Sequence, residues 1–151
     1  MITYASVDEF AAMKGEVLGT SEWVPVTQEQ INLFADATGD HSWIHVDPKR
    51  AAAGPFGATI AHGLMTLSMV QDLARQMWQV EGISMIVNYG FNKVRFPAPV
   101  TAGSRVRARL ALVGVEPAGP GAWQATIGVT VEVEGGTKPA VASELLLRMV
   151  G

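Results

Sequence analysis

The sequence contains no cysteine, no excess of basic residues and no long apolar run. The absence of thiols excludes disulfide scaffolds, Cys-ligated zinc, iron–sulfur clusters and thiol nucleophiles. Eleven Lys and Arg against 14 Asp and Glu give a net charge of −3, with no basic cluster that would bind nucleic acid or an anionic membrane surface. No window reaches the roughly 18 consecutive apolar residues of a membrane-spanning helix. We therefore expect neither nucleic acid nor a membrane as a partner.

Several well-known sequence motifs are missing as well. There is no GxSxG nucleophile elbow, P-loop, GxGxxG fingerprint or EF-hand spacing, so nothing indicates nucleotide-driven chemistry. The start of the chain carries Asp8 and Glu9 and has no apolar stretch behind a basic beginning, unlike a secretory signal. We expect a cytoplasmic protein.

The residues that are present indicate one folded domain over residues 1–151. Apolar residues make up 48% of the chain and charged residues 17%, which is enough to build a core. A short helix is expected at 7–13, followed by strand-like segments up to residue 26. A second helix begins at the capping box Thr27–Gln30 and ends at Gly39. Residues 64–80 are apolar on most faces and predict a helix that is buried nearly all round.

The second half of the chain has the pattern of β-strands. Its segments alternate apolar and polar residues or are rich in β-branched residues, and turn clusters separate them; they are residues 84–96, 105–115, 123–134 and 141–150. Four consecutive strands favour an antiparallel meander. Together with the preceding helices they predict an α+β fold in which one sheet wraps the apolar helix.

Residues 40–61 are expected to form a long irregular segment, and such segments often carry function. Asp40 and His45 lie in it, where they can converge on one cleft as an acid/base pair. An imidazole with a pKa of about 6.5 accepts a proton near neutral pH, and a carboxylate can hold its tautomer or move a second proton. The alternative is that Asp40 caps a helix and His45 is a hydrogen-bonded surface imidazole.

A metal site was weighed for the same segment. His41 and His45 are four residues apart and are flanked by Asp40 and Asp47. A loop does not place such a pair on one face as a helix would, so we expect no metal.

Gly63 stands at the start of the apolar helix. A glycine there leaves its N–H open to a substrate carbonyl, and the partial positive charge of a helix N-terminus can stabilise an oxyanion. The alternative is that Gly63 is small because a neighbouring strand packs against it.

The string from Phe34 to Pro48, FADATGDHSWIHVDP, resembles the hydratase motif of the MaoC-like family. That motif has an aromatic residue, then Gly-Asp, then Asn-Pro, then an aliphatic residue and His. Ala61-His62-Gly63 and the segment from Arg95 to Gly103 also resemble a single-domain (R)-specific enoyl-CoA hydratase. The resemblance covers nearly the whole chain.

The resemblance implies a hotdog fold, with an antiparallel sheet around a long central helix over residues 63–80. It implies homodimers that pair two sheets edge to edge, and a segment 40–61 that overhangs an acyl-thioester tunnel. Carried over by motif position, Asp40 and His45 are the catalytic pair, and the Gly63 N–H is the donor to the thioester carbonyl.

The activity that the resemblance implies is reversible, (R)-specific hydration of a trans-2-enoyl-CoA to the (R)-3-hydroxyacyl-CoA, within fatty acid metabolism. Coenzyme A is then part of the substrate, and no cofactor is needed. His45 and Asp40 would hold one water between them. Which of the two is the base stays open, since coupled groups titrate as a pair.

The chain departs from the family motif at two positions. Ser42 and Trp43 stand where the motif has Asn-Pro, so Ser42 is expected to supply the hydrogen bond of the Asn, and Trp43 to reshape the pocket entrance. Ser68, five residues after Gly63, is expected to orient substrate or water. Its alternative role is that of a helix serine bonded to a backbone carbonyl.

Two rival functions remain. A hotdog acyl-CoA thioesterase usually places its carboxylate on the central helix, where this chain offers only Asp72, too far along to meet Gly63. A catalytically silent acyl-binding subunit of a heteromeric dehydratase is the other rival. The intact Asp40 and His45 argue against it.

Overall fold

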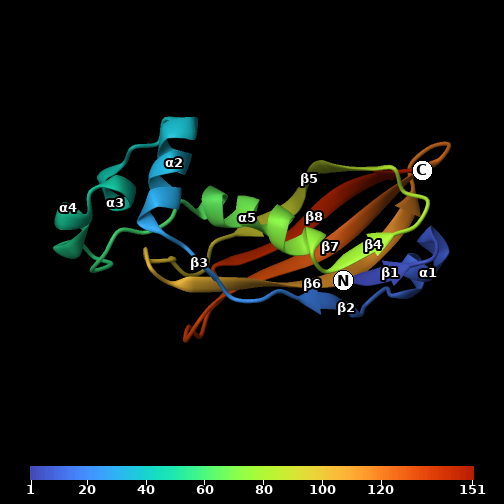
Figure 1. The fold of residues 1–151 in the computed structure, drawn as a ribbon, viewed down its shortest axis with the longest axis horizontal. Coiled ribbons are helices and arrows are strands. Elements are labelled where there is room, and N and C mark those ends of the chain that lie inside the picture. Colours follow the sequence, from blue (N-terminus) through green and yellow to red (C-terminus); the bar gives the residue numbers. More distant parts are fainter.

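The computed structural model describes residues 1–151. The molecule is elongated, with a sheet and one helix forming most of its length and three shorter helices projecting at one end (Figure 1). Its elements are β1 (Ile2–Tyr4), α1 (Val7–Ala12), β2 (Val17–Thr20), β3 (Val24–Pro25), α2 (Gln28–Thr38), α3 (Trp43–Val46), α4 (Pro48–Ala52), α5 (Gly63–Arg75), β4 (Trp78–Val80), β5 (Met85–Arg95), β6 (Arg105–Pro117), β7 (Ala122–Val133) and β8 (Val141–Val150).

The main sheet is antiparallel and has the strand order β2-β6-β7-β8-β5, with β3 also paired to β6. The four strands predicted in the second half of the chain are confirmed, but the four-strand meander is wrong. Only β6, β7 and β8 form one, whereas β5 pairs with β8 at the far edge. The chain between β5 and β6 is not a hairpin turn, because it pairs with the segment that precedes α5. Ala61 donates its N–H to the Val100 carbonyl, and Ile60 and Thr101 form an isolated antiparallel β-bridge.

Helix α5 lies across one face of the sheet and packs on β6, β7 and β8 (Figure 1). Its buried side chains are Met65, Thr66, Leu67, Val70 and Leu73. Burying an aliphatic side chain of this size contributes about 1.5–3 kcal/mol, so this face of the helix fixes it on the sheet.

The predicted extent of this helix is wrong. It ends at Arg75 rather than at residue 80, because Trp78–Val80 form β4 and pair in parallel with Ile2–Tyr4 of β1. It is also not buried all round, since Leu64, Ser68 and Asp72 lie on an exposed stripe. None of the helices is long and apolar enough to cross a membrane.

The ends of α2 are as predicted. The Thr27 hydroxyl accepts the Gln30 N–H, the Gln30 side chain accepts the Thr27 N–H, and Gly39 adopts a left-handed conformation with φ 81°. A residue without Cβ takes this conformation at no steric cost, and the chain leaves the helix at Asp40.

Residues 40–61 are less irregular than predicted, because they contain the short helices α3 and α4. The Asp47 side chain accepts the Arg50 N–H, and Pro48 occupies the first position of α4. An Asp N-cap followed by Pro is a helix-start signal.

Candidate active site

Asp40 and His45 face each other at the N-terminal end of α5, as the sequence predicted. Asp40 follows the Gly39 cap of α2, and His45 lies in α3. The Asp40 Oδ2 is 3.9 Å from the His45 Nε2. The carboxylate is 56% exposed, whereas His45 is 8% exposed, so the pair joins a buried imidazole to a group that solvent can reach.

The tautomer of His45 follows from its partner. Its Nδ1 lies 2.6 Å from the Ile60 carbonyl oxygen, which can only accept a hydrogen bond. Nδ1 therefore carries the hydrogen, and the neutral ring keeps its lone pair on Nε2, the atom that faces Asp40.

A polar network around Gln28 fixes the backbone on both sides of His45. The Gln28 side chain donates to the His45 carbonyl at 2.8 Å and accepts the Thr59 hydroxyl, and the Ile60 N–H donates to the Ile44 carbonyl at 2.9 Å. These bonds join α2, α3 and the segment before α5. The sequence analysis missed Gln28, since its partners lie 17 and 31 positions away.

His62 is a third side chain at the site, which the sequence analysis did not assign to it. It is the N-cap residue of α5 and is 4% exposed. Its Nε2 lies 2.9 Å from the Asp40 carbonyl oxygen and 3.9 Å from the Asp40 Oδ2, and its ring stacks on His45 with centroids 3.8 Å apart. The one signal in the sequence was its place directly before Gly63.

Gly63 is the first residue of α5, as predicted, and it is crowded. A Cβ on Gly63 would lie 2.8 Å from the ring of Phe96, which directly follows β5, so close packing leaves no room for a larger residue here. Gly63 and Phe96 also line a pocket of about 290 Å³ with mostly apolar walls. Ile60, whose carbonyl oxygen lies 2.6 Å from the His45 Nδ1, lines the same pocket, so the pocket adjoins His45.

Ser42 and Ser68 form hydrogen bonds only with residues close to them in the sequence. The Ser42 backbone N–H donates to the Asp40 Oδ1 at 3.3 Å, whereas its side chain forms no cap hydrogen bond. The Ser68 hydroxyl donates to the Leu64 carbonyl at 2.7 Å, which is the helix-serine alternative. The Arg50 guanidinium packs over Trp43, with its Cζ 4.3 Å from the centroid of the Trp43 ring.

With this geometry in view, comparison with known proteins decides the family. Residues 9–135 match the family described as MaoC like domain. The chain belongs to the MaoC-like dehydratase family. The predicted family and the hotdog fold class are therefore confirmed.

Relatives of this MaoC-like protein agree with the assignment. The 3-hydroxyacyl-thioester dehydratase Z of Mycobacterium tuberculosis is 61% identical over 150 residues, 99% of each chain. Nodulation protein N of Rhizobium meliloti is 44% identical over 140 residues, 91% of this chain and 87% of that one. The solved (R)-hydratase from A. caviae involved in PHA biosynthesis has a TM-score of 0.70 and 25% identity, and the match covers 87% of this chain and 95% of that one. The predicted class of enzyme, a hydratase or dehydratase, is confirmed.

Asp40, His45 and His62 of this MaoC-like protein are also the one set of His, Asp or Glu side chains close enough to share a metal ion, with ligand atoms within 4.8 Å of one another. The Nε2 of His62, the ring nitrogen that faces Asp40, donates its hydrogen to the Asp40 carbonyl and has no lone pair free for an ion there. His41, a candidate ligand in the sequence, instead contacts Asp36 at 2.8 Å.

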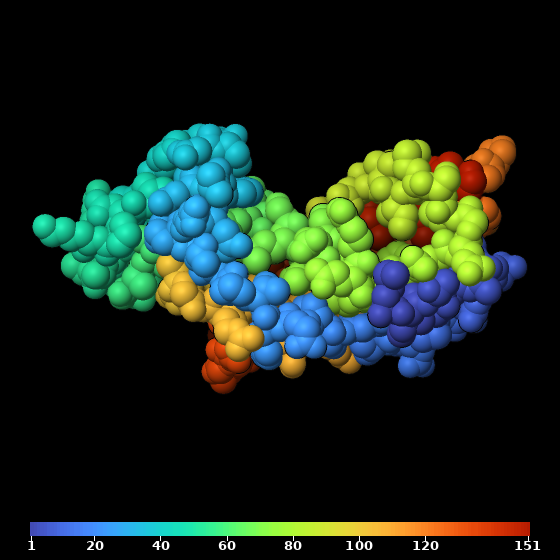
Figure 2. Space-filling model, viewed as in Figure 1, coloured from blue at the N-terminus to red at the C-terminus, as the bar shows by residue number.

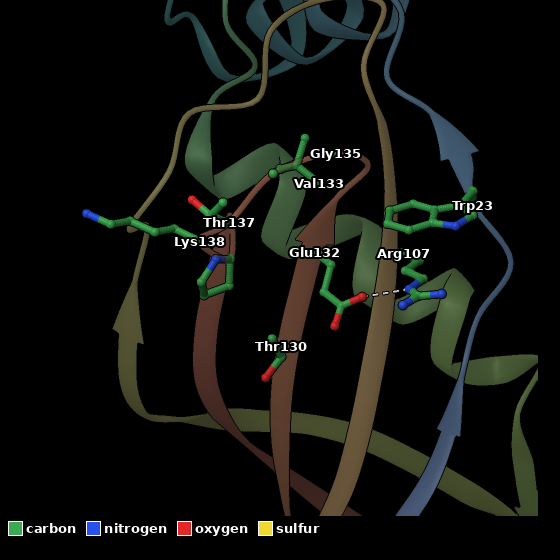
Figure 3. Close-up of a pocket in the computed structure, with 10 residues that line it drawn as sticks. Trp23, Arg107, Thr130, Glu132, Val133, Gly135, Thr137 and Lys138 are labelled. Carbon is green, nitrogen blue, oxygen red and sulfur yellow. Dashed lines mark hydrogen bonds and ion pairs between the residues drawn. The ribbon is translucent and has the colours of Figure 1, made fainter.

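A second pocket, of about 350 Å³, lies on β6 and β7 at the sheet face away from α5 (Figure 3). Three charged side chains line it. Arg107 and Glu132 form an ion pair at 2.6 Å with the Arg107 guanidinium packed over Trp23, whereas Lys138 points away from that pair (Figure 3). Because Arg107 and Glu132 neutralise each other and no histidine lines this pocket, it is not the candidate active site.

Proposed function

We propose that this MaoC-like enzyme catalyses the reversible, (R)-specific hydration of trans-2-enoyl-CoA to (R)-3-hydroxyacyl-CoA. The observation that carries the proposal is the pairing of the Asp40 carboxylate with the bare Nε2 of His45, beside the N-terminus of α5. Relatives named as a 3-hydroxyacyl-thioester dehydratase and an (R)-hydratase support this substrate class.

The separation of the two groups leaves a place for water. At 3.9 Å, the Asp40 Oδ2 and the His45 Nε2 are too far apart for a direct hydrogen bond, and a water beside them can bond both. The His45 Nε2 takes one proton of that water as its oxygen bonds to C3. The Asp40 carboxylate accepts a hydrogen bond from the remaining O–H and so orients the attack.

The electron pair of the C2=C3 bond moves onto the thioester oxygen, and an enolate forms. The Gly63 N–H, at the positive end of α5, donates to this oxygen and stabilises its charge. The His45 imidazolium then returns its proton to C2 as the carbonyl re-forms, which leaves His45 neutral again. The apolar pocket lined by Phe56, Val100 and Phe96 receives the hydrocarbon part of the substrate. Coenzyme A is part of the substrate, and this scheme uses no cofactor or metal.

The structure disfavours the thioesterase alternative. Asp72, the one carboxylate on α5, lies nine residues after Gly63, about 14 Å along the helix at a rise of about 1.5 Å per residue. It is exposed and accepts a hydrogen bond from Gln76. It therefore cannot act on a thioester held at Gly63.

We also propose that the enzyme works as a homodimer. Strand β5 pairs only with β8, and its other edge is open. Its exposed side chains include Met85, Ile86, Val87, Tyr89 and Phe91. Figure 2 shows a hollow beside α5 with β8 at its floor, where Ile86, Leu145 and Leu147 line a pocket of about 450 Å³. An apolar edge strand next to an apolar hollow is suited to pairing with a second copy. The cytoplasmic location stays a prediction from the sequence.

The test is turnover of crotonyl-CoA, followed as loss of the conjugated enoyl-thioester absorbance. We expect (R)-3-hydroxybutyryl-CoA as product, and a loss of about 10²–10⁴-fold in kcat for His45→Gln and for Asp40→Asn, the range typical of a positioned acid/base group. Asp72→Asn and His41→Gln are matched controls and should retain wild-type turnover. Full activity in either site variant, or release of free coenzyme A, contradicts the proposal.

A further inference from the structure

His62 makes two contacts with the catalytic pair, one to each member. Its Nε2 lies 2.9 Å from the Asp40 carbonyl oxygen, and its ring stacks on the His45 ring with a centroid distance of 3.8 Å and an interplanar angle of 25°. These contacts join three places that are far apart in sequence: the end of α2, helix α3 and the start of α5. The ring also packs against Phe34 of α2, with centroids 4.9 Å apart.

The hydrogen bond fixes the tautomer of His62. A carbonyl oxygen only accepts, so Nε2 carries the hydrogen, and in the neutral ring Nδ1 is left as a bare acceptor. That Nδ1 is buried and has no hydrogen-bond partner. A buried acceptor without a partner costs stability, so packing alone does not explain why an imidazole stands here.

An imidazole combines two properties that tyrosine and tryptophan offer only in larger side chains. It is a flat ring that lies against the His45 ring, and it carries a donor at its far end that reaches the Asp40 carbonyl. Phenylalanine would keep the ring and lose the donor. Glutamine would keep a donor at nearly the same place and lose the ring.

We propose that His62 is the positioning residue of the active site, which holds the Asp40 backbone and the His45 ring at the separation that fits one water. This inference rests on the proposed hydration by Asp40 and His45 and adds the group that sets their geometry. The Asp40 side chain is exposed, and the other hydrogen bonds of Asp40 join it to Thr38 and Ser42, two residues away on either side. The hydrogen bond from His62 is therefore the one that ties the Asp40 backbone to α5. The stacked ring limits rotation of His45 about its side-chain bonds, while the Ile60 carbonyl fixes its Nδ1.

The experiment compares His62→Gln and His62→Phe with wild type on crotonyl-CoA, with His41→Gln as a matched histidine control. We expect both His62 variants to lower kcat by about 10- to 100-fold, the loss that a misplaced catalytic group produces, while KM changes less than about threefold. His62→Phe keeps the stacked ring and loses only the hydrogen bond to the Asp40 carbonyl, so its effect should pass through Asp40. We therefore expect the double variant His62→Phe/Asp40→Asn to be hardly slower than Asp40→Asn alone. His41→Gln should match wild type.

A second measurement separates positioning from folding. The pH profile of kcat should differ from wild type in both His62 variants and not in His41→Gln, at temperatures where all the proteins remain folded. If the wild type turns over crotonyl-CoA and the kcat of both His62 variants lies within about twofold of the wild-type kcat, the positioning role is overturned and the proposed hydration stands. An inactive wild type instead contradicts the proposed hydration, and with it the positioning role that rests on it.

Discussion

At the scale of single residues, His41 offers a direct test of the electrostatics around the site. A hydrogen bond from its ring to Asp36 at 2.8 Å raises the pKa of His41 above its usual value of about 6.5. The raised pKa means that the pair stabilises the fold below the ordinary pKa and that this contribution is lost as pH rises through the folded pKa. We expect Asp36→Asn to lower the pKa of His41, measured by NMR titration of its ring hydrogens. A pKa that does not move contradicts the assigned cause.

Some residues of the site could be predicted from the sequence, and others could not. Asp40 and His45 were predictable because they lie five positions apart in one motif, and the Gly39 cap that releases them is a local signal. Gln28 and His62 were not, because their roles depend on partners 17 to 31 positions away. Apart from the place of His62 directly before Gly63, nothing next to either residue in the chain distinguishes it from an ordinary helix-start side chain.

At the scale of elements, the contact between α5 and the chain after β5 explains Gly63. A Cβ at this position would lie 2.8 Å from the ring of Phe96, so Gly63→Ala should cost about 1–3 kcal/mol of stability in denaturant unfolding, as other overpacked sites do. In a Phe96→Leu background the same change should cost clearly less, because the smaller side chain gives way. Equal costs in both backgrounds would show that Phe96 is not the obstacle.

The helices and strands were predictable where their signals are local. The capping box and left-handed glycine of α2 act within a few residues, and both of its ends were placed correctly. The end of α5 depends instead on Trp78–Val80 pairing with the first residues of the chain, and the position of β5 depends on β8. Apolar periodicity carries no information about partners so far apart in sequence. The prediction from it therefore made the helix too long and the strand order a simple meander.

At the scale of the whole molecule, the open edge of β5 predicts the assembly. We expect sedimentation to show a species of twice the 16.0 kDa chain mass. Ile86 is 46% exposed on this strand, and a charge there would be buried by the partner, so Ile86→Lys should shift the protein to monomer. Leu33, 62% exposed on α2, supplies the matched control, and Leu33→Lys should leave the dimer unchanged. A wild-type monomer, or an Ile86→Lys dimer, contradicts the proposal.

The strand order also has a consequence for how the chain folds. The hairpins β6–β7 and β7–β8 close across short turns, whereas pairing β5 with β8 brings Met85 against Val150 and closes a loop that contains β6 and β7. Loop-closure entropy delays such a pairing, so the two hairpins form first and β5 joins them afterwards. The apolar strand that the proposed dimer buries therefore stays unpaired after the hairpins have formed. This makes the kinetics of its docking, rather than the stability of the finished fold, the step most exposed to aggregation.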